Sequence, residues 1–406
     1  MNARNLARAV THLPPRELIG RVVRRAAQRL DTAALGFPLL PGDVADSADP
    51  SLPRRGAPAR RTTETAPRVG WLVVPPGAGS GGHTTLFRMM AAAHTRGMRN
   101  TLLFYDRWDG DVAAQAATVR RAWPWLTCDI ARVGEDLGDF DAIVASSWQT
   151  AHVAARRRVP GQAVLYFAQD FEPYFSARGS EYAYAEDSYR LGLTIVALGR
   201  MVADTVRAEV GVDVHEVPFG CDTDTYRLTD GAVTHRRGVL FYAKPGNERR
   251  GYRLAVDALR RFHAARPDEP IHVYGDATRL PFPVVSHGSL TPERLNLLYN
   301  QVVTGLALSF TNISLVAEEM LAAGVVPVVN DSPLARADLR HPDVLWARPT
   351  AIALAEALQS AVDRGDRDAH ARAVAAAVTT PPWAHTGALF ADILTAEIGV
   401  PAAVTA

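Results

Sequence analysis

Short apolar runs alternate with longer stretches of helical periodicity along the chain from residue 69 onward. In the first half, runs rich in β-branched and aromatic residues predict strands over 69–74, 100–104, 142–145 and 163–167. Apolar positions at helical spacing predict helices between them, over 84–96, 111–122 and 150–158. This alternation indicates a parallel, doubly wound sheet, because a parallel crossover needs a connection about as long as a helix.

The same alternation restarts after a polar stretch over residues 215–237, where we place a domain boundary. The second series predicts strands over 239–243, 271–274, 303–309 and 326–330, with helices over 252–265, 292–300, 316–323 and 351–364. The predicted fold class is therefore α/β, with two Rossmann-like, doubly wound domains facing each other across a cleft. Ligands of open α/β sheets bind outside the carboxyl ends of the strands, so two such domains offer room for two substrates.

An N-terminal helical extension precedes the two domains. Residues 1–30 carry seven arginines against the single acid Glu17, with apolar residues at helical spacing, so they predict a basic amphipathic helix. This helix either makes peripheral contact with an anionic membrane surface or packs, solvated, on its own domain. Residues 38–67 are rich in Pro, Ala, Asp and Arg without periodicity, which is typical of a linker.

Composition places the chain among ordinary globular proteins. It has 406 residues, 48% of them hydrophobic and 21% charged, and a net charge of +1, so no nucleic-acid partner is expected. Only Cys128 and Cys221 are present, without metal-ligand spacing, so neither a disulfide framework nor a metal site is expected. The sequence contains no long apolar run and no signal-peptide pattern, which favours a cytoplasmic location, at the inner face of the plasma membrane if residues 1–30 bind lipid.

A glycine-rich segment follows the first predicted strand. Gly77, Gly79 and Gly82 have GxGxxG spacing, and the next helix is expected to begin near Thr84. Glycines allow close backbone approach, and a helix N-terminus offers free N–H groups to an anion or a sugar hydroxyl. We therefore assign Gly81, Gly82 and His83 to the cleft, with a tight strand-to-helix turn as the alternative.

Two carboxylates lie in an aromatic segment over residues 166–175, at the end of a predicted strand. Aromatic faces suit the C–H surface of sugars, and a carboxylate at a strand end can accept or orient a hydroxyl. Asp170 is the predicted catalytic carboxylate on this side, with Glu172 and Tyr174 beside it in the cleft. The alternative role for the acids is helix N-capping or an ion pair with Arg178.

The second domain opens with a strand that ends in a basic, glycine-containing loop over residues 241–251. Lys244, the only lysine among 44 basic residues, and Arg250 are predicted to neutralise a departing diphosphate. The alternative is a solvated basic loop, and Glu248 favours that alternative for its neighbour Arg249.

The pattern over residues 309–329 predicts the end of a strand, a small polar loop, a helix and a buried strand. Its helix carries Glu319, which we expect to accept hydrogen bonds from ribose hydroxyls in the same crevice as Lys244. A surface position is the simpler interpretation of the neighbouring acid Glu318.

Four of these segments, 79–83, 166–174, 179–182 and 319–324, carry a resemblance to a known family. Over roughly residues 69–390 the chain resembles the retaining GT-B glycosyltransferases of family 4, and within it the WsaF-type bacterial rhamnosyltransferases. The resemblance makes Glu319 the second acid of the family's E-x7-E pattern, whose first acid is replaced here by Thr311. The implied donor-binding residues are Lys244, Arg250, Gly275, Asn312, Ser314, Leu315 and Glu319, and the implied catalytic residues are Asp170, Lys244 and Arg250.

The resemblance also implies how the chain is divided and what it does. Residues 1–66 would hold the basic helix and linker, 67–218 the acceptor-binding domain, 219–382 the donor-binding domain, and 383–406 a C-terminal helix and tail returning to the N-terminal domain. The implied reaction transfers a hexose with retention by front-face attack, from dTDP-L-rhamnose to a hydroxyl of a bacterial cell-surface glycan, lipid-linked or free. The partners would be the nucleotide sugar and the glycan, with no cofactor and no metal.

Three other functions are consistent with the sequence. The first is a transferase that uses another nucleotide hexose, such as GDP-mannose or a UDP-sugar. The second is an NAD(P)-dependent oxidoreductase, favoured by the glycine loop and the doubly wound domains. The third is a non-catalytic nucleotide-sugar- or glycan-binding module, favoured by Thr311 in place of an acid.

Overall fold

The computed structural model describes residues 37–45, 47, 66–229, 235–276, 279–313 and 315–399. The chain divides into two compact units, residues 1–44 and 45–406. Within the described part of the first unit lies a short 3-10 helix, η1 (Pro41–Asp43). The predicted basic helix over 1–30 and most of the predicted linker over 38–67 lie outside the described residues.

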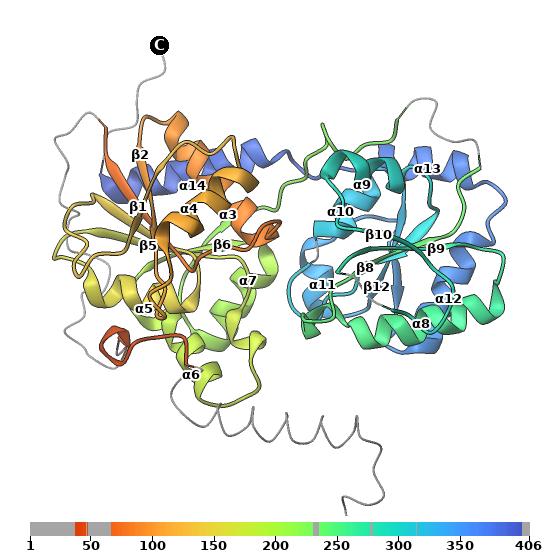
Figure 1. The fold of residues 1–406 in the computed structure, drawn as a ribbon, viewed down its shortest axis with the longest axis horizontal. Helices are drawn as coiled ribbons and strands as arrows, with labels where there is room; N and C mark the ends of the chain where they lie inside the picture. The colour runs from red at the N-terminus through yellow and green to blue at the C-terminus, as the bar shows by residue number, and fades with distance from the viewer. Residues whose placement is uncertain are drawn as a thin grey trace, which may run out of the picture. The chain divides into compact units, whose positions relative to one another are not determined.

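The described part of residues 45–229 builds a seven-stranded parallel sheet in the order β3-β2-β1-β4-β5-β6-β7 (Figure 1). Its strands are β1 (Arg68–Val73), β2 (Arg99–Phe104), β3 (Asp129–Arg132), β4 (Ala142–Ala145), β5 (Ala163–Ala168), β6 (Thr194–Leu198) and β7 (His215–Val217). Its helical segments are α3 (Gly81–Thr95), α4 (Val112–Ala122), α5 (Trp148–Arg157), η2 (Glu172–Phe175), α6 (Ser180–Asp187), η3 (Ser188–Arg190), α7 (Arg200–Thr205) and η4 (Val206–Val210).

The described residues from 235 to 382 build a six-stranded parallel sheet in the order β10-β9-β8-β11-β12-β13. Its strands are β8 (Val239–Ala243), β9 (Ile271–Gly275), β10 (Val285–Gly288), β11 (Thr304–Leu306), β12 (Val326–Asn330) and β13 (Leu345–Ala347). Its helices are η5 (Glu248–Arg250), α8 (Tyr252–Ala265), α9 (Pro292–Tyr299), α10 (Leu315–Ala322), α11 (Pro333–Asp338), α12 (Ala351–Val362) and α13 (Arg367–Ala376).

Both sheets are doubly wound, which confirms the predicted α/β fold class. Every residue of the central strands β4, β5 and β12 is buried, as expected for parallel strands covered by helices on both faces. The strand order reverses between β1 and β4 in the first sheet and between β8 and β11 in the second. Loops at such switch points are where open α/β sheets bind ligands.

The last described helix, α14 (Trp383–Ile398), packs along α3 and against the first sheet. The ring centroid of Phe390 lies 5.7 Å from that of Trp71 in β1 and 5.1 Å from that of Phe167 in β5. A Cβ on Gly387 would stand 2.8 Å from the Cβ of Ala92, so glycine permits this close helix contact. The chain therefore returns to the first sheet after completing the second.

Two sequence-based boundaries need correction, and strands β3, β6, β7, β10 and β13 were not predicted. Helix α3 begins at Gly81 rather than near Thr84, because the backbone bends into the helix after Ser80, so the predicted glycine loop supplies the first helical turn. Strand β11 is shorter than the predicted 303–309. Strand β3 was missed because its residues are mostly exposed and polar, as an edge strand allows.

Candidate functional site

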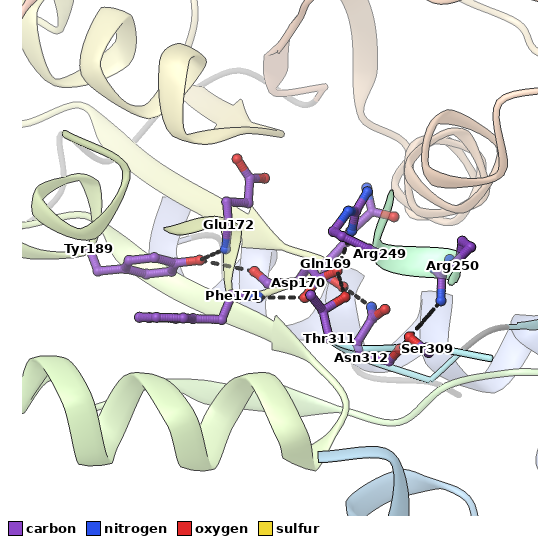
Figure 2. Close-up of polar contacts among 10 residues, drawn as sticks. All are labelled: Gln169, Asp170, Phe171, Glu172, Tyr189, Arg249, Arg250, Ser309, Thr311 and Asn312. Atoms are coloured by element: carbon purple, nitrogen blue, oxygen red, sulfur yellow. Dashed lines mark hydrogen bonds and ion pairs between the residues drawn. The ribbon is translucent and has the colours of Figure 1, made fainter. Parts of the chain in front are cut away.

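Asp170 lies directly after strand β5, where residues from both sheets meet (Figure 2). Nη1 of Arg249 donates to Oδ2 of Asp170 at 2.7 Å, and Oγ1 of Thr311 donates to the same oxygen at 2.8 Å. The N–H of Phe171 donates to Oδ1 at 2.9 Å. Only 4% of Asp170 is exposed, so this carboxylate of the first sheet is buried among donors that come largely from the second.

The topology explains this meeting. Asp170 follows β5, Arg249 lies in η5 after β8, and Thr311 follows β11, so all three occupy carboxyl-terminal loops of their sheets. Two further contacts reinforce it. The carbonyl of Gln169 accepts a hydrogen bond from Nδ2 of Asn312, and Oη of Tyr189 donates to the carbonyl of Asp170 at 2.9 Å.

Burial raises the pKa of Asp170 above its ordinary value, while the charge of Arg249 and the hydroxyl of Thr311 oppose that rise. The guanidinium of Arg249 also lies over the ring of Phe175, 3.7 Å from its centroid. The Arg249 side chain is thus held both by its ion pair with Asp170 and by its cation–π contact with Phe175. The interpretation of Arg249 as a solvated loop residue was wrong, because only the fold brings Asp170 and Phe175 next to it.

Arg250 lies beside this pair and points into the loop that follows β11. Its Nη1 donates to Oγ of Ser309 at 2.7 Å, and burial lowers its pKa to about 10, opposed chiefly by Asp170. Ser309 is held in turn by Asn330, whose side chain bonds both the N–H and the carbonyl of Ser309 at 2.7 Å. A half-buried guanidinium is therefore held in place at the switch point of the second sheet.

Asn312 has one satisfied and one unsatisfied end. Its Nδ2 donates to Gln169, whereas its buried Oδ1 has no hydrogen-bond partner among the described residues. Buried polar atoms are rarely left unpaired, so an unpaired acceptor in a ligand crevice is well placed to receive a ligand hydroxyl.

Lys244 lies on the same loop as Arg250 but nearer to solvent. Its Nζ pairs with Asp276 at 2.9 Å, 41% of its side chain is exposed, and this hydrogen bond raises the pKa of Lys244. The neighbouring Gly275 has φ +106°, and a Cβ there would stand 2.5 Å from the carbonyl oxygen of Ala243. Gly275 thus allows β8 and β9 to end close together.

Glu319 lies on α10, and Oη of Tyr299 donates to its carboxylate at 3.2 Å. Burial raises the pKa of Glu319 to about 7, against the lowering effect of Tyr299 and Arg88. Its neighbour Glu318 is only 7% exposed and accepts a hydrogen bond from Thr380 at 2.7 Å, so the surface interpretation of Glu318 was wrong. Leu315 is the first residue of α10, and Ser314 lies outside the described residues.

Glu172 is turned away from Asp170, as Figure 2 shows. Its Oε2 accepts the N–H of Trp148, the first residue of α5, at 2.7 Å, and burial raises its pKa to about 8. The placement of Glu172 in the cleft is therefore corrected: its carboxyl satisfies a free N–H at a helix start, the alternative role considered from the sequence.

Of the remaining predicted first-domain residues, Gly81, Gly82 and His83 lie at the start of α3, whereas Tyr174 lies in η2. Both ring nitrogens of His83 are occupied, Nδ1 by Oγ of Ser80 at 2.7 Å and Nε2 by the carbonyl of Val74 at 3.1 Å, and burial lowers its pKa. His83 thus stabilises the turn, as the strand-to-helix alternative implied. Gly82 faces Gln169, with 3.6 Å between its ideal Cβ position and Oε1, whereas Gly81 has open space around it. Tyr174 packs edge-on against Phe171, with 4.9 Å between the ring centroids.

The structure thus brings Asp170, Arg250 and Asn312 together, and it leaves Lys244 on the loop after β8 and Glu319 on helix α10. It adds Arg249 and Ser309, which sequence reasoning missed, and Thr311, which it named only as a replaced acid. Across the described ranges, no group of three or more His, Cys, Asp or Glu side chains is arranged to hold a metal ion. None of the helices there is long and apolar enough to span a bilayer.

One segment of the chain matches a known protein family. The segment 237–359, from the start of β8 through most of α12, matches the family model described as the C-terminal domain of WsaF. Residues 237–359 are therefore similar to the C-terminal domain of WsaF. The matched segment contains Lys244, Arg249, Arg250, Asn312 and Glu319.

One curated relative matches about three quarters of the chain. The O-antigen biosynthesis protein RfbC of Myxococcus xanthus is 30% identical over 335 residues, which are 76% of this chain and 25% of that protein. The chain therefore spans about a quarter of the length of this relative.

Solved structures share the fold. The Anabaena protein HepE, crystallised with UDP-glucose, matches with a TM-score of 0.60 and 14% identity over 81% of this chain and all of its own. WaaG, a glycosyltransferase involved in lipopolysaccharide biosynthesis, matches with a TM-score of 0.56 and 14% identity over 80% of this chain and 99% of its own. The shared fold confirms the predicted GT-B architecture, and the match over residues 237–359 confirms the resemblance to WsaF.

Proposed function

We propose that the chain is a glycosyltransferase, which moves a hexosyl group from a nucleotide-diphosphate sugar to a hydroxyl of a bacterial cell-surface glycan. One observation carries the proposal. A buried carboxylate that follows the first sheet, Asp170, binds Arg249 and Thr311 of the second sheet and lies within the electrostatic influence of the half-buried Arg250. Such a junction places an acceptor-orienting acid beside cations suited to a leaving diphosphate.

On the donor side, Arg250 and Lys244 would neutralise the charge that develops on the diphosphate as the sugar leaves. Arg250 is fixed by Ser309, whereas Lys244 is accessible enough to move from Asp276 to a phosphate. Oδ1 of Asn312 would accept a sugar hydroxyl, and Glu319 a ribose hydroxyl. Gly275, at the end of β9, and Leu315, at the start of α10, complete the proposed donor-binding set together with Ser314. The UDP-glucose bound to HepE, which has the same fold, supports this assignment.

On the acceptor side, Asp170 would orient the attacking hydroxyl, with Gly81, Gly82 and Tyr174 around the acceptor. The acceptor oxygen bonds to the anomeric carbon as the bond from that carbon to the diphosphate oxygen breaks. The hydroxyl proton passes to the departing diphosphate, so the products are the glycoside and the nucleoside diphosphate. Arg249 and Thr311 both donate to Oδ2 of Asp170, so the acceptor hydroxyl would share this carboxylate with them.

The identity of the substrates is the finer part of the proposal. The WsaF-type resemblance supports dTDP-L-rhamnose as donor and transfer with retention, in which attack and departure occur on one face of the sugar. The similarity to the O-antigen protein RfbC supports a surface glycan as acceptor, lipid-linked or free. A peripheral membrane contact through residues 1–30 would bring the enzyme to a lipid-linked acceptor.

Two measurements test the function. A thermal-shift panel of dTDP, UDP, GDP and their hexose derivatives should show stabilisation by the preferred nucleotide, because ligand binding raises apparent stability by mass action. Transfer of radiolabelled hexose from the preferred donor to surface-glycan fragments should then follow, with the anomeric configuration read by NMR. Oxidation or reduction of NAD(P) in place of transfer would overturn the proposal.

A non-catalytic nucleotide-sugar-binding module is the second candidate, because Thr311 stands where the resembling family has an acid. The contact between Thr311 and Asp170 weakens this objection, since it brings a carboxylate from the first sheet to that position. Stabilisation by a nucleotide sugar without transfer or hydrolysis of the donor would favour the module.

A further inference from the structure

A groove of about 760 Å³ runs along one face of α3. Its other walls are the end of α4 with the residues that follow it, the start of α14 and the start of α9. Its aromatic lining consists of Trp123, Trp125 and Trp383, and small residues such as Ala91, Ala92 and Gly387 form much of the rest. This volume is typical of a ligand site, which usually measures about 300–1,000 Å³.

Two of the three tryptophans are fixed walls. Trp123 is 4% exposed and its Nε1 donates to Oγ1 of Thr84 at 2.8 Å, while Trp383 is 8% exposed and lies beneath the guanidinium of Arg88, 5.0 Å from the ring centroid. Trp125 differs, because 47% of it is exposed. An exposed indole in a groove is suited to stacking against the C–H face of a sugar ring.

The charges of the groove favour a neutral ligand. Each cation that lines it within the described residues is paired with a carboxylate, Arg88 with Asp222 at 3.5 Å and Arg96 with Asp392 at 2.7 Å. A lipid pyrophosphate would need to take one of these cations from its partner. An uncharged glycan needs only ring faces and scattered hydrogen-bonding groups.

One end of the groove lies at the glycine turn that precedes α3, and this turn is close to the proposed reaction centre. Gly79 lines one end, and Gly82, in the first turn of α3, faces Gln169, whose carbonyl is bonded by Asn312 beside Asp170. From that end the lining follows α3 from Thr84 to Arg96, roughly 18 Å at the rise of an α-helix. An acceptor with its reacting hydroxyl at Asp170 therefore has a path for several further sugar units.

We propose that this groove binds the non-reacting sugar units of a neutral oligosaccharide acceptor, with Trp125 as its stacking platform. The inference rests on the proposed function, because transfer to a glycan is what gives the groove an acceptor chain to hold. It adds that the acceptor is an extended glycan, recognised over several units, rather than a single sugar.

The test uses the full chain and an array of bacterial cell-surface oligosaccharides graded from one sugar unit to several. The wild-type protein should bind longer members more tightly than their terminal monosaccharides. Trp125→Ala should abolish most of this gain, an effect of about tenfold in affinity, and Trp125→Phe should keep part of it. Trp108→Ala is the matched control, because Trp108 is 60% exposed and does not line the groove.

The outcomes separate the groove from the function. Equal affinity for short and long glycans, or no effect of Trp125→Ala on length dependence, would overturn the groove assignment even if transfer occurs. Binding that grows with the alkyl chain of a glycoside, rather than with its sugar units, would overturn it in favour of a lipid site. Trp125-dependent glycan binding without any transfer would uphold the groove and count against the transferase.

Discussion

Asp170 and Glu172 stand two residues apart at the end of β5, are both buried, and have opposite surroundings. Asp170 faces the second sheet and is held by Arg249 and Thr311, whereas Glu172 faces α5 and accepts one backbone N–H. Burial raises the pKa of both carboxyls, but only Asp170 has a neighbouring cation as the largest opposing influence. The two carboxyls therefore differ in the groups that bind them, and not in residue class or burial: Asp170 is bound from the second sheet and Glu172 from α5.

The largest difference is expected for Asp170→Asn against Glu172→Gln. Asp170→Asn keeps the size of the side chain but removes the charge that orients the acceptor, so transfer should fall about 100-fold or more while nucleotide binding is retained. In Glu172→Gln the new amide oxygen can still accept the N–H of Trp148, so transfer should stay near the wild-type rate. Rates with labelled donor measure both. Equal rates for Asp170→Asn and the wild type would remove Asp170 from the mechanism.

The next largest effect is expected for Arg250→Ala, because this change removes a half-buried cation from the proposed diphosphate site. Hydrogen bonds to charged groups contribute about 1.5–3 kcal/mol, so affinity for the preferred nucleoside diphosphate should fall about 10- to 100-fold. Lys244→Ala should have a smaller effect of the same sign, since Lys244 is more exposed and already paired. Calorimetric titration measures both, and unchanged affinity in Arg250→Ala would contradict the donor assignment.

Arg249→Ala sharpens the comparison by making Asp170 resemble Glu172. Without this cation the pKa of Asp170 should rise further, because Arg249 is the largest influence that lowers it. If ionised Asp170 is needed, the acidic limb of the pH–rate profile should move to higher pH, while the exposed α8 variant Arg253→Ala leaves it in place. A profile unaffected by Arg249→Ala would show that the ion pair does not control the titration of Asp170.

The smallest effect on turnover, but a distinct effect on stability, is expected for Glu172→Gln. The folded-state pKa of Glu172, about 8, exceeds its ordinary 4.5, so between these values the native state holds a proton that the unfolded state has released. The contribution of Glu172 to the free energy of unfolding therefore falls as pH rises through this window. Thermal unfolding across the window should show a flatter pH dependence in Glu172→Gln than in the control Glu356→Gln, which lies exposed on α12. Parallel curves for the two variants would refute the assignment.

The candidate site was predicted in part. Asp170 and Arg250 were identified because each follows a predicted strand, where parallel sheets bind ligands, and Asn312 was identified from the family resemblance. Arg249 was dismissed because Glu248 stands beside it, and local sequence offered no sign of Asp170, 79 residues away. Glu172 was placed with Asp170 because sequence proximity does not show which way a side chain points after a strand ends.

The sequence by itself determined the two doubly wound sheets, because the alternation of apolar runs with helical periodicity is a local property that each segment carries. It also determined which loops follow the strands and thus where ligand-binding residues gather. Only the tertiary structure decided which residues of those loops meet. The contact between Thr311 and Asp170 joins positions 141 residues apart, and the groove beside Trp125 needs α3, α9 and α14 together. Such partners depend on how separately specified elements pack, and no local pattern encodes that.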